Sequence, residues 1–363
     1  MKLELTWEQQ ALEDSVRKIL QGVKVPIKAT ELEAQPNGYD EGLWKQFIEA
    51  GFTGLLENNS FTELVVLHEQ LGYFRAQLPL ITSCVTGLGL LRLLKSQPEA
   101  AAIAGKVSAG DAIIAPALWG GGKDTASPQK GVIRKNGKIT GKKLLVPFFD
   151  CARWLVVLVD SDPLQLCLVE AKAAGIRGVK PDNLAVENAW TVEFSDTPVL
   201  LSAEISKPQL DKALLPSAMA ITALSAGAAK KALDMTMEWV NMREAFGHKL
   251  ASFQVLQHYL TNIAMDTAAT RHLAYYGAWS LAHDEENAAR IVASGKLFAG
   301  ESFERIAGIS LRMFGGHGFL EDSGMPLFFR RAKAWQLSMG GHQFWRDVLA
   351  QASGLRWSAT DGK

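Results

Sequence analysis

The feature of this sequence that most limits its fold is a double change of hydrophobic periodicity. Up to about residue 110, apolar residues recur at helical intervals, as in Leu43, Phe47, Ile48 and Phe52. From 111 to about 205, short β-branched runs alternate with turn residues, and from 206 the helical spacing returns. We therefore predict a mainly α protein with a central β domain: an N-terminal helical domain over 1–110, a small β-barrel or sandwich over 111–205, and a C-terminal four-helix bundle over 206–363.

Local signals predict where some elements begin and turn. Thr6 precedes Gln9 at the spacing of a capping box, which predicts a helix start. Asn136-Gly137 lies between two short strand-like runs and predicts a hairpin. The apolar, β-branched run Trp154–Val159 predicts a buried strand.

The C-terminal unit is expected to contain long helices. Ala228, Ala232, Met235, Trp239, Met242 and Phe246 step by three and four, which predicts one apolar seam along a helix over 225–246. Further helices are expected over 255–282 and 287–312, with Gly315-Gly316 closing the last of them.

Composition excludes several classes of function. The chain has 38 basic and 38 acidic residues, so no net field attracts nucleic acid or an anionic membrane. Its apolar runs are too short for a membrane span, and its start lacks the pattern of a signal peptide. The three cysteines (Cys84, Cys151 and Cys167) lie far apart, which favours free thiols over disulfides or a metal site. We expect a soluble cytoplasmic protein without a metal.

Four segments, in the same order along the chain, resemble those of acyl-CoA dehydrogenases. They are Gly141-Lys142-Lys143 followed by Ala152–Val157, Arg243-Glu244-Ala245-Phe246-Gly247 with Phe253-Gln254 downstream, Gly315-Gly316-His317-Gly318-Phe319, and Arg330-Arg331-Ala332-Lys333-Ala334. Each motif alone is common, because an arginine on a helix is usually a solvated charge and a glycine pair usually ends a helix. Together with the α–β–α order they identify the chain as similar to that family.

The resemblance implies an FAD site shared between two chains, and hence a dimer or larger assembly. It assigns Arg243 to the flavin pyrophosphate, which a guanidinium binds with two hydrogen bonds. It assigns packing or hydrogen bonding against the nucleotide to Phe246, one turn further on the same helix, and to Gln254. Gly315 and Gly316 are expected to let the backbone approach the cofactor. His317 and His258 are expected to be structural or exposed.

The catalytic base of the family has no counterpart in this sequence. Family members use a glutamate to remove the proton α to the thioester while hydride leaves for the flavin. The aligned position is Met339, ahead of Gly340-Gly341. The alternative location, on the helix before Arg243, corresponds to Ser217 or Leu224, and residues 213–233 contain no Asp or Glu. Asp211 and Glu238 lie outside the aligned positions.

Other departures concern the flavin contacts. The family's acidic and hydroxyl-bearing flavin loop is replaced by residues 115–122, APALWGGG, and the triplet beside flavin N5 by Leu144-Leu145-Val146. Arg312 stands where the family has a glutamine, three residues before the glycine pair, and offers a second phosphate contact.

These features lead to one main hypothesis and two alternatives. The main hypothesis is an oxidoreductase subunit without a base, which contributes FAD contacts to a mixed oligomer whose glutamate comes from a related subunit. The substrate is then a CoA thioester, with bulky lipid or steroid side chains suggested by the resemblance. The alternatives are a homomeric flavoenzyme with other chemistry, such as a monooxygenase or oxidase, and a non-enzymatic scaffold.

Overall fold

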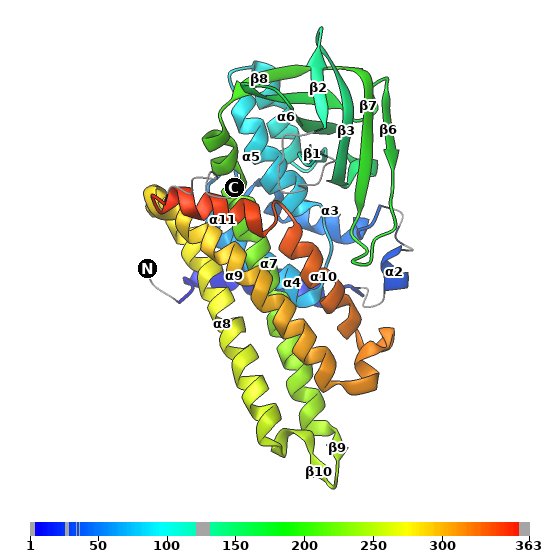
Figure 1. Ribbon diagram of the computed structural model, residues 1–363, viewed down its shortest axis with the longest axis vertical. Helices are drawn as coiled ribbons and strands as arrows, with labels where there is room; N and C mark the ends of the chain where they lie inside the picture. Colours follow the sequence, from blue (N-terminus) through cyan, green and yellow to red (C-terminus); the bar gives the residue numbers. More distant parts are fainter. Residues whose placement is uncertain (1–3, 26–28, 34, 36, 121–130, 356–363) are drawn as a thin grey trace, which may run out of the picture.

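The computed structural model describes residues 4–25, 29–33, 35, 37–120 and 131–355. Figure 1 shows helices, then two β-sheets at one end of the molecule, then long helices that extend to the other end. The fold class predicted from the sequence is confirmed: the protein is mainly helical with a central β domain.

The N-terminal unit is a cluster of helices around α4. Its elements are α1 (Trp7–Gln21), α2 (Ala29–Glu33), α3 (Glu41–Glu49), η1 (Phe52–Gly54), α4 (Phe61–Phe74), the π-helical η2 (Leu80–Gly87), α5 (Leu88–Leu91), η3 (Arg92–Leu94) and α6 (Pro98–Ser108). The predicted capping box is present, since the Thr6 hydroxyl accepts from the Gln9 N–H and the Gln9 side chain accepts from the Thr6 N–H.

Two four-stranded sheets form the middle unit. One has the order β1 (Ile114–Ala117), β4 (Trp154–Val159), β5 (Leu164–Glu170) and β8 (Leu201–Ile205), with β1 and β4 parallel. The other has the order β2 (Val132–Lys135), β3 (Lys138–Pro147), β7 (Ala189–Pro198) and β6 (Ile176–Val179), and η4 (Phe149–Cys151) follows β3. Asn136 and Gly137 both have positive φ and join β2 to β3, so the predicted hairpin is confirmed.

Long helices make up the C-terminal unit. They are α7 (Lys207–Met242), α8 (Gln254–His283), α9 (Glu285–Met313), α10 (Met325–Leu337) and α11 (His342–Ala352), with β9 (Glu244–Ala245), β10 (His248–Lys249), η5 (Leu250–Ser252), η6 (Gly315–Phe319) and η7 (Glu321–Ser323) between them. By length and composition α7 resembles a membrane span, but 78% of its most apolar window is buried within the protein. It is therefore a core helix.

The helix predicted over 225–246 ends earlier than expected. Met242 is its last residue, Arg243 is its C-cap with extended backbone, and Phe246 has a φ of +55° in the turn between β9 and β10. Phe246 matches the helical spacing of the apolar residues before it, but this match is a coincidence. The following Gly247, with a φ of +80°, allows the chain to reverse direction there.

The N-terminal and C-terminal units approach each other closely where α4 crosses α7. A Cβ atom on Gly72 would lie 2.0 Å from the Leu224 carbonyl oxygen, and one on Gly227 would lie 1.8 Å from the Glu69 carbonyl oxygen. Both distances are far below van der Waals contact, so the two helix backbones touch only because these positions lack side chains. The crossing fixes the position of α7 relative to the N-terminal unit.

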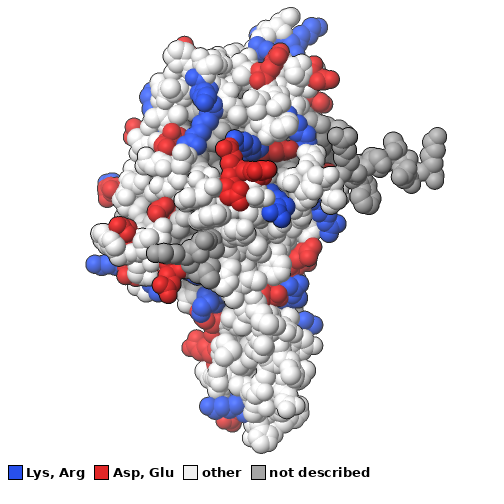
Figure 2. Space-filling model, turned by 90° about the vertical axis from the view of Figure 1, so that its left-hand side faces the viewer, with Lys and Arg blue, Asp and Glu red and all other residues white. Residues whose placement is uncertain are grey.

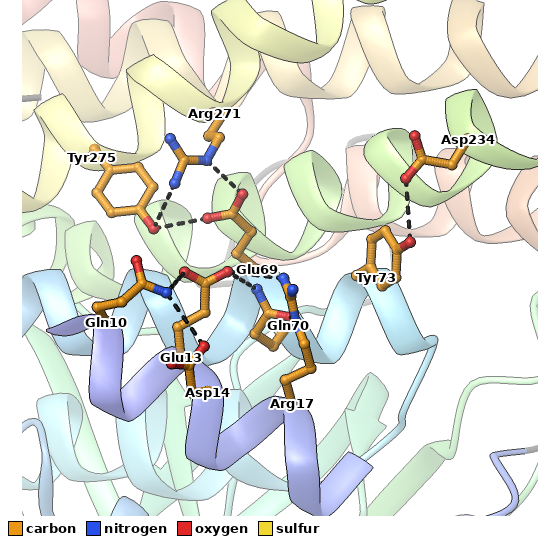
Figure 3. A network of polar contacts seen from close by, with 10 residues as sticks. All are labelled: Gln10, Glu13, Asp14, Arg17, Glu69, Gln70, Tyr73, Asp234, Arg271 and Tyr275. Atoms are coloured by element: carbon orange, nitrogen blue, oxygen red, sulfur yellow. Dashed lines mark hydrogen bonds and ion pairs between the residues drawn. The ribbon is translucent and has the colours of Figure 1, made fainter. Parts of the chain in front are cut away.

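Polar side chains surround this crossing and connect four helices (Figure 3). Glu69 on α4 accepts hydrogen bonds from Arg271 at 2.7 Å and from Tyr275 at 2.8 Å, both on α8. Tyr73 donates to Asp234 on α7, and the Gln70 amide donates to Glu13 on α1. Burial and the negative charge of Glu69 raise the pKa of Tyr275, so this phenol stays a hydrogen-bond donor.

We expect Gly227→Ala to lower the free energy of unfolding by about 1–3 kcal/mol, because the added methyl group forces α4 and α7 apart. The matched control is Gly105→Ala on α6, where an added Cβ meets nothing within 4 Å. That change should stabilise the protein by up to about 1 kcal/mol, through helix propensity alone. Urea unfolding of the two variants measures the difference. Equal effects would show that the crossing is not close-packed.

Candidate functional site

The residue aligned with the family's base, Met339, lies in the link between α10 and α11. Its φ is +53°, and its side chain is buried. The Trp345 indole donates to its carbonyl oxygen at 3.1 Å, and the Thr86 hydroxyl donates to its sulfur at 3.9 Å. Helix α11 and η2 therefore hold this link in one position.

Ser217, one of the two alternative base positions, lies at the same place. Its hydroxyl shares a hydrogen bond of 2.8 Å with Thr86, and both side chains are fully buried. Leu224, the other alternative, lies two turns further along α7, at the crossing with Gly72. The structure thus brings Met339 and Ser217 together around Thr86, and none of the three side chains ionises at neutral pH.

Thr86 was not identified from the sequence. It lies in the π-helical segment η2, whose wider turn presents it between α7 and the α10–α11 link. Pro79 before a run of β-branched and small residues is compatible with several conformations, so the sequence held no specific signal for it.

Asp211 and Glu238 are the acidic residues that lie closest in sequence to Ser217 and Leu224, but neither contacts the Met339–Ser217–Thr86 group. Asp211 accepts a hydrogen bond of 2.6 Å from Lys207, and burial raises the pKa of its carboxyl group although Lys207 acts against the shift. Glu238 is exposed, more than five turns beyond Ser217. Within the described residues, no carboxylate hydrogen-bonds to Met339, Ser217 or Thr86.

The residues of the β domain that were predicted to line the flavin differ in their exposure. Val146 is fully buried in β3 and pairs with Trp190 of β7. Leu145 has a φ of +54° and is 56% exposed, because β3 is bulged between Lys143 and Val146. Trp119 packs edge-on against Phe344 of α11, with ring centroids 6.1 Å apart. Gly121 and Gly122 of the predicted flavin loop lie outside the described residues.

A buried lysine supports this part of β3. The Lys143 ammonium group donates to the Leu118 carbonyl oxygen at 2.8 Å, and burial lowers its pKa to about 7, partly opposed by Asp160. Strand β3 is therefore tied to the end of β1 by a side chain as well as by the bridge between Gly120 and Lys143.

The other predicted cofactor residues lie at the far end of α7. Arg243, Phe246 and Gln254, the first residue of α8, are exposed, and Phe246 is 93% exposed. Arg243 follows Ser217 by 26 positions on one helix, which corresponds to roughly 39 Å. The two groups of residues therefore cannot contact one dinucleotide within a single chain.

The glycine pair is joined to this end of α7 by aromatic stacking. The Trp239 indole stacks on Phe314 and on His317, each with ring centroids 4.9 Å apart, and donates to the Met313 carbonyl oxygen. Gly315 and Gly316 are exposed, and Cβ atoms there would meet nothing within 4 Å. The expectation that His317 is exposed or structural agrees with this stacking.

Arg312 is also exposed, and it lines an open cleft of about 580 Å³ between α9, η6 and α10. Neither Arg312 nor Arg243 forms an ion pair within the part of the chain that the structure describes. On the face that Figure 2 shows, the projecting end of the molecule carries fewer charged side chains than the body. Arg243 and Arg312 are both exposed.

Among the described residues, no group of three or more His, Cys, Asp or Glu is placed to hold a metal ion.

Comparisons with known proteins agree with the sequence motifs. Residues 208–354 match the family model described as acyl-CoA dehydrogenase, C-terminal domain. Acyl-CoA dehydrogenase FadE27 of Mycobacterium tuberculosis is 25% identical over 360 residues, which cover 94% of this chain and 95% of FadE27. The probable acyl-CoA dehydrogenase YngJ of Bacillus subtilis is 30% identical over 133 residues, only 37% of this chain and 35% of YngJ.

Solved structures share the fold along nearly the whole chain. The ChsE4-ChsE5 complex from Mycobacterium tuberculosis has a TM-score of 0.84 at 22% identity, covering 99% of this chain and 100% of the matched one. A variant of the Tcur3481-Tcur3483 steroid ACAD has a TM-score of 0.83 at 23% identity, covering 96% and 98%.

We expect Met339→Glu to destabilise the protein by about 3–5 kcal/mol at pH 8, because it places an unpaired carboxylate among neutral buried groups. Burial raises the pKa of such a carboxyl group above its unfolded value, so the loss should shrink as pH falls through the raised folded pKa. Met339→Gln, which stays neutral, is the control. Chemical unfolding between pH 5 and pH 8 tests this, and a loss independent of pH would mean that the position is hydrated.

Proposed function

The chain belongs to the acyl-CoA dehydrogenase family, and from this premise we propose that it is the subunit of a mixed oligomer that lacks the base. The observation that carries the proposal is the pair of residues found where the family's base is expected. Met339 and Ser217 occupy these positions, both contact Thr86, and no carboxylate hydrogen-bonds to them among the described residues. A thioether accepts no proton at neutral pH, and a buried hydroxyl pair is a poor base. The glutamate then comes from a related chain.

The exposed end of α7 fits the phosphate end of FAD. Arg243 and Arg312 offer unpaired guanidinium groups, and the glycine pair leaves the backbone of η6 open to a ligand. Their exposure is expected of residues that meet a cofactor held mainly by another chain. Phe246 and Gln254 lie on the same side of the proposed contact, on the β9–β10 turn and the start of α8.

The flavin-ring half of the site fits less well. Among the described residues of the β domain, Val146 is fully buried and Trp119 packs on Phe344, so neither side chain is free to contact a flavin ring in this arrangement. We therefore propose that this chain contributes to an FAD site centred on its partner and does not itself hold the reactive ring.

In the assembled enzyme, FAD supplies the hydride acceptor for α,β-dehydrogenation of a CoA thioester. The residues of this chain bind and position: Arg243 neutralises pyrophosphate charge, and Phe246 covers an apolar part of the nucleotide. The oligomer is proposed to act in the cytoplasm. The structural neighbour named a steroid ACAD makes steroid-derived CoA thioesters the first substrates to test.

We expect a complex of this chain with a related, glutamate-bearing chain to hold one FAD per pair of chains. Arg243→Ala should then weaken flavin retention about 10–100-fold, because it removes a charge-assisted hydrogen-bonded pair worth roughly 1.5–3 kcal/mol. Arg290→Ala, at an exposed arginine on the opposite end of α9, should change nothing. The flavin absorbance gives the amount of FAD, and light scattering gives the mass of the complex. Together they give the number of FAD molecules per pair of chains. Two flavins per pair, or full retention by Arg243→Ala, would contradict the proposal.

The chain without its partner should not dehydrogenate acyl-CoA thioesters at an appreciable rate. Loss of a positioned base removes about 10²–10⁴-fold in rate. The measurement is anaerobic flavin bleaching by a range of thioesters, with free FAD supplied. Rapid bleaching by any thioester would mean that the chain has its own base. Stable flavin binding by the chain alone, without bleaching, would instead favour a homomeric flavoenzyme with other chemistry.

A further inference from the structure

Two arginine side chains, one buried and one half-buried, lie where the three units of the protein meet. Arg331 on α10 is only 2% exposed. Arg75 is the C-cap of α4, with a φ of +63°, and its Nε and Nη1 atoms are buried. The nearest residues of the β domain belong to the segment before β7, which contributes Glu187.

The two side chains are adjacent and share few acceptors. Arg331 donates from Nη1 to the Arg75 carbonyl oxygen at 2.9 Å and from Nη2 to Gln77 Oε1 at 2.7 Å. The Arg75 guanidinium lies over the Phe328 ring, 5.3 Å from its centroid. Three buried N–H donors, Nε and Nη1 of Arg75 and Nε of Arg331, have no acceptor among the described residues.

The charges around the pair do not balance. Glu187 Oε1 lies 3.9 Å from Arg331 Nε, and the same oxygen accepts a hydrogen bond from the Trp335 indole at 3.0 Å. From α7, Lys231 adds a third positive charge: burial and then the charge of Arg75 lower the pKa of its ammonium group.

The acids of α7 do not compensate Arg75. Asp234 pairs with Lys230 and accepts from Tyr73, and both Asp234 and Glu238 act on Lys231 by raising its pKa. Burial and the charge of Arg331 lower the pKa of Arg75 to about 10, so the group remains a cation at neutral pH. Burial also lowers the pKa of Arg331, and Glu187 partly opposes that shift.

Arg331 has Glu187 as a counter-charge at 3.9 Å, whereas Arg75 has no ion pair among the described residues. A largely buried cation without a counter-charge is costly, and hydrogen-bonded water would satisfy its donors but leave its charge uncompensated. We propose that Arg75 and Arg331 bind a small monovalent anion, of the size of chloride or nitrate, between their unpaired N–H groups. The anion connects the C-terminal end of α4 to α10. The residues that would bind the anion differ from those of the proposed flavin contact, although Arg330, next to Arg331 in the chain, lines the same cleft as Arg312.

The experiment is thermal unfolding of the full chain, with its partner where co-purified, at constant ionic strength. Chloride or nitrate replaces gluconate, which is too large for an enclosed site. The melting temperature should rise with chloride and saturate, because an anion that binds only the folded state stabilises it by mass action. Arg75→Met and Arg75→Gln should abolish the chloride dependence. Arg305→Met, at an exposed arginine paired with Asp266, should keep it.

Diffraction from crystals grown in bromide provides a second readout that needs no variant. An anomalous peak within hydrogen-bond distance of Arg75 and Arg331 Nε is expected. A water at that place with no anomalous signal, a wild-type melting temperature insensitive to chloride, or the same chloride dependence in the Arg75 variants would each overturn the proposal.

Discussion

The backbone contact between α4 and α7 is the constraint on which the arrangement of this molecule depends. Gly72 and Gly227 let the two helices approach until carbonyl oxygens lie where side chains would otherwise be. The polar ring of Glu69, Gln70 and Tyr73 then connects the same stretch of α4 to α1, α7 and α8. Because α7 is held this closely at Gly227, the positions of the residues at its two ends are fixed relative to α4.

The two ends of α7 carry opposite kinds of surface. Near its start, Ser217 lies in a dry, neutral contact with Thr86 and Met339, while Arg243 at its end is open to solvent. A neutral, buried position at one end of α7 and exposed guanidinium groups at the other are what the proposed role, completing the site of another chain, requires. This division follows from which residues occupy the two ends of α7, since the fold itself matches that of the solved structures.

The sequence predicted the fold well because its signals are local and mutually consistent. The capping box at Thr6, the Asn136-Gly137 hairpin and the β4 run each depend on a few adjacent residues. The end of α7 was predicted wrongly, since Phe246 satisfies the helical spacing while Gly247 permits the reversal that the chain takes. Thr86 and the Arg75–Arg331 pair could not be predicted, because residues more than 130 positions apart form them and no local pattern marks either. The roles assigned to Arg243, Gln254 and the glycine pair remain predictions.

The exposure of Phe246 has a consequence for how the protein is made. Its phenyl ring is 93% exposed, and Met242 at the end of α7 is 66% exposed, so this tip presents apolar surface to other molecules. Under the proposed assembly, molecules made in excess of the covering chain would expose that surface to one another and to quality-control proteases. The amounts of the two chains would then have to be matched to keep the protein in solution.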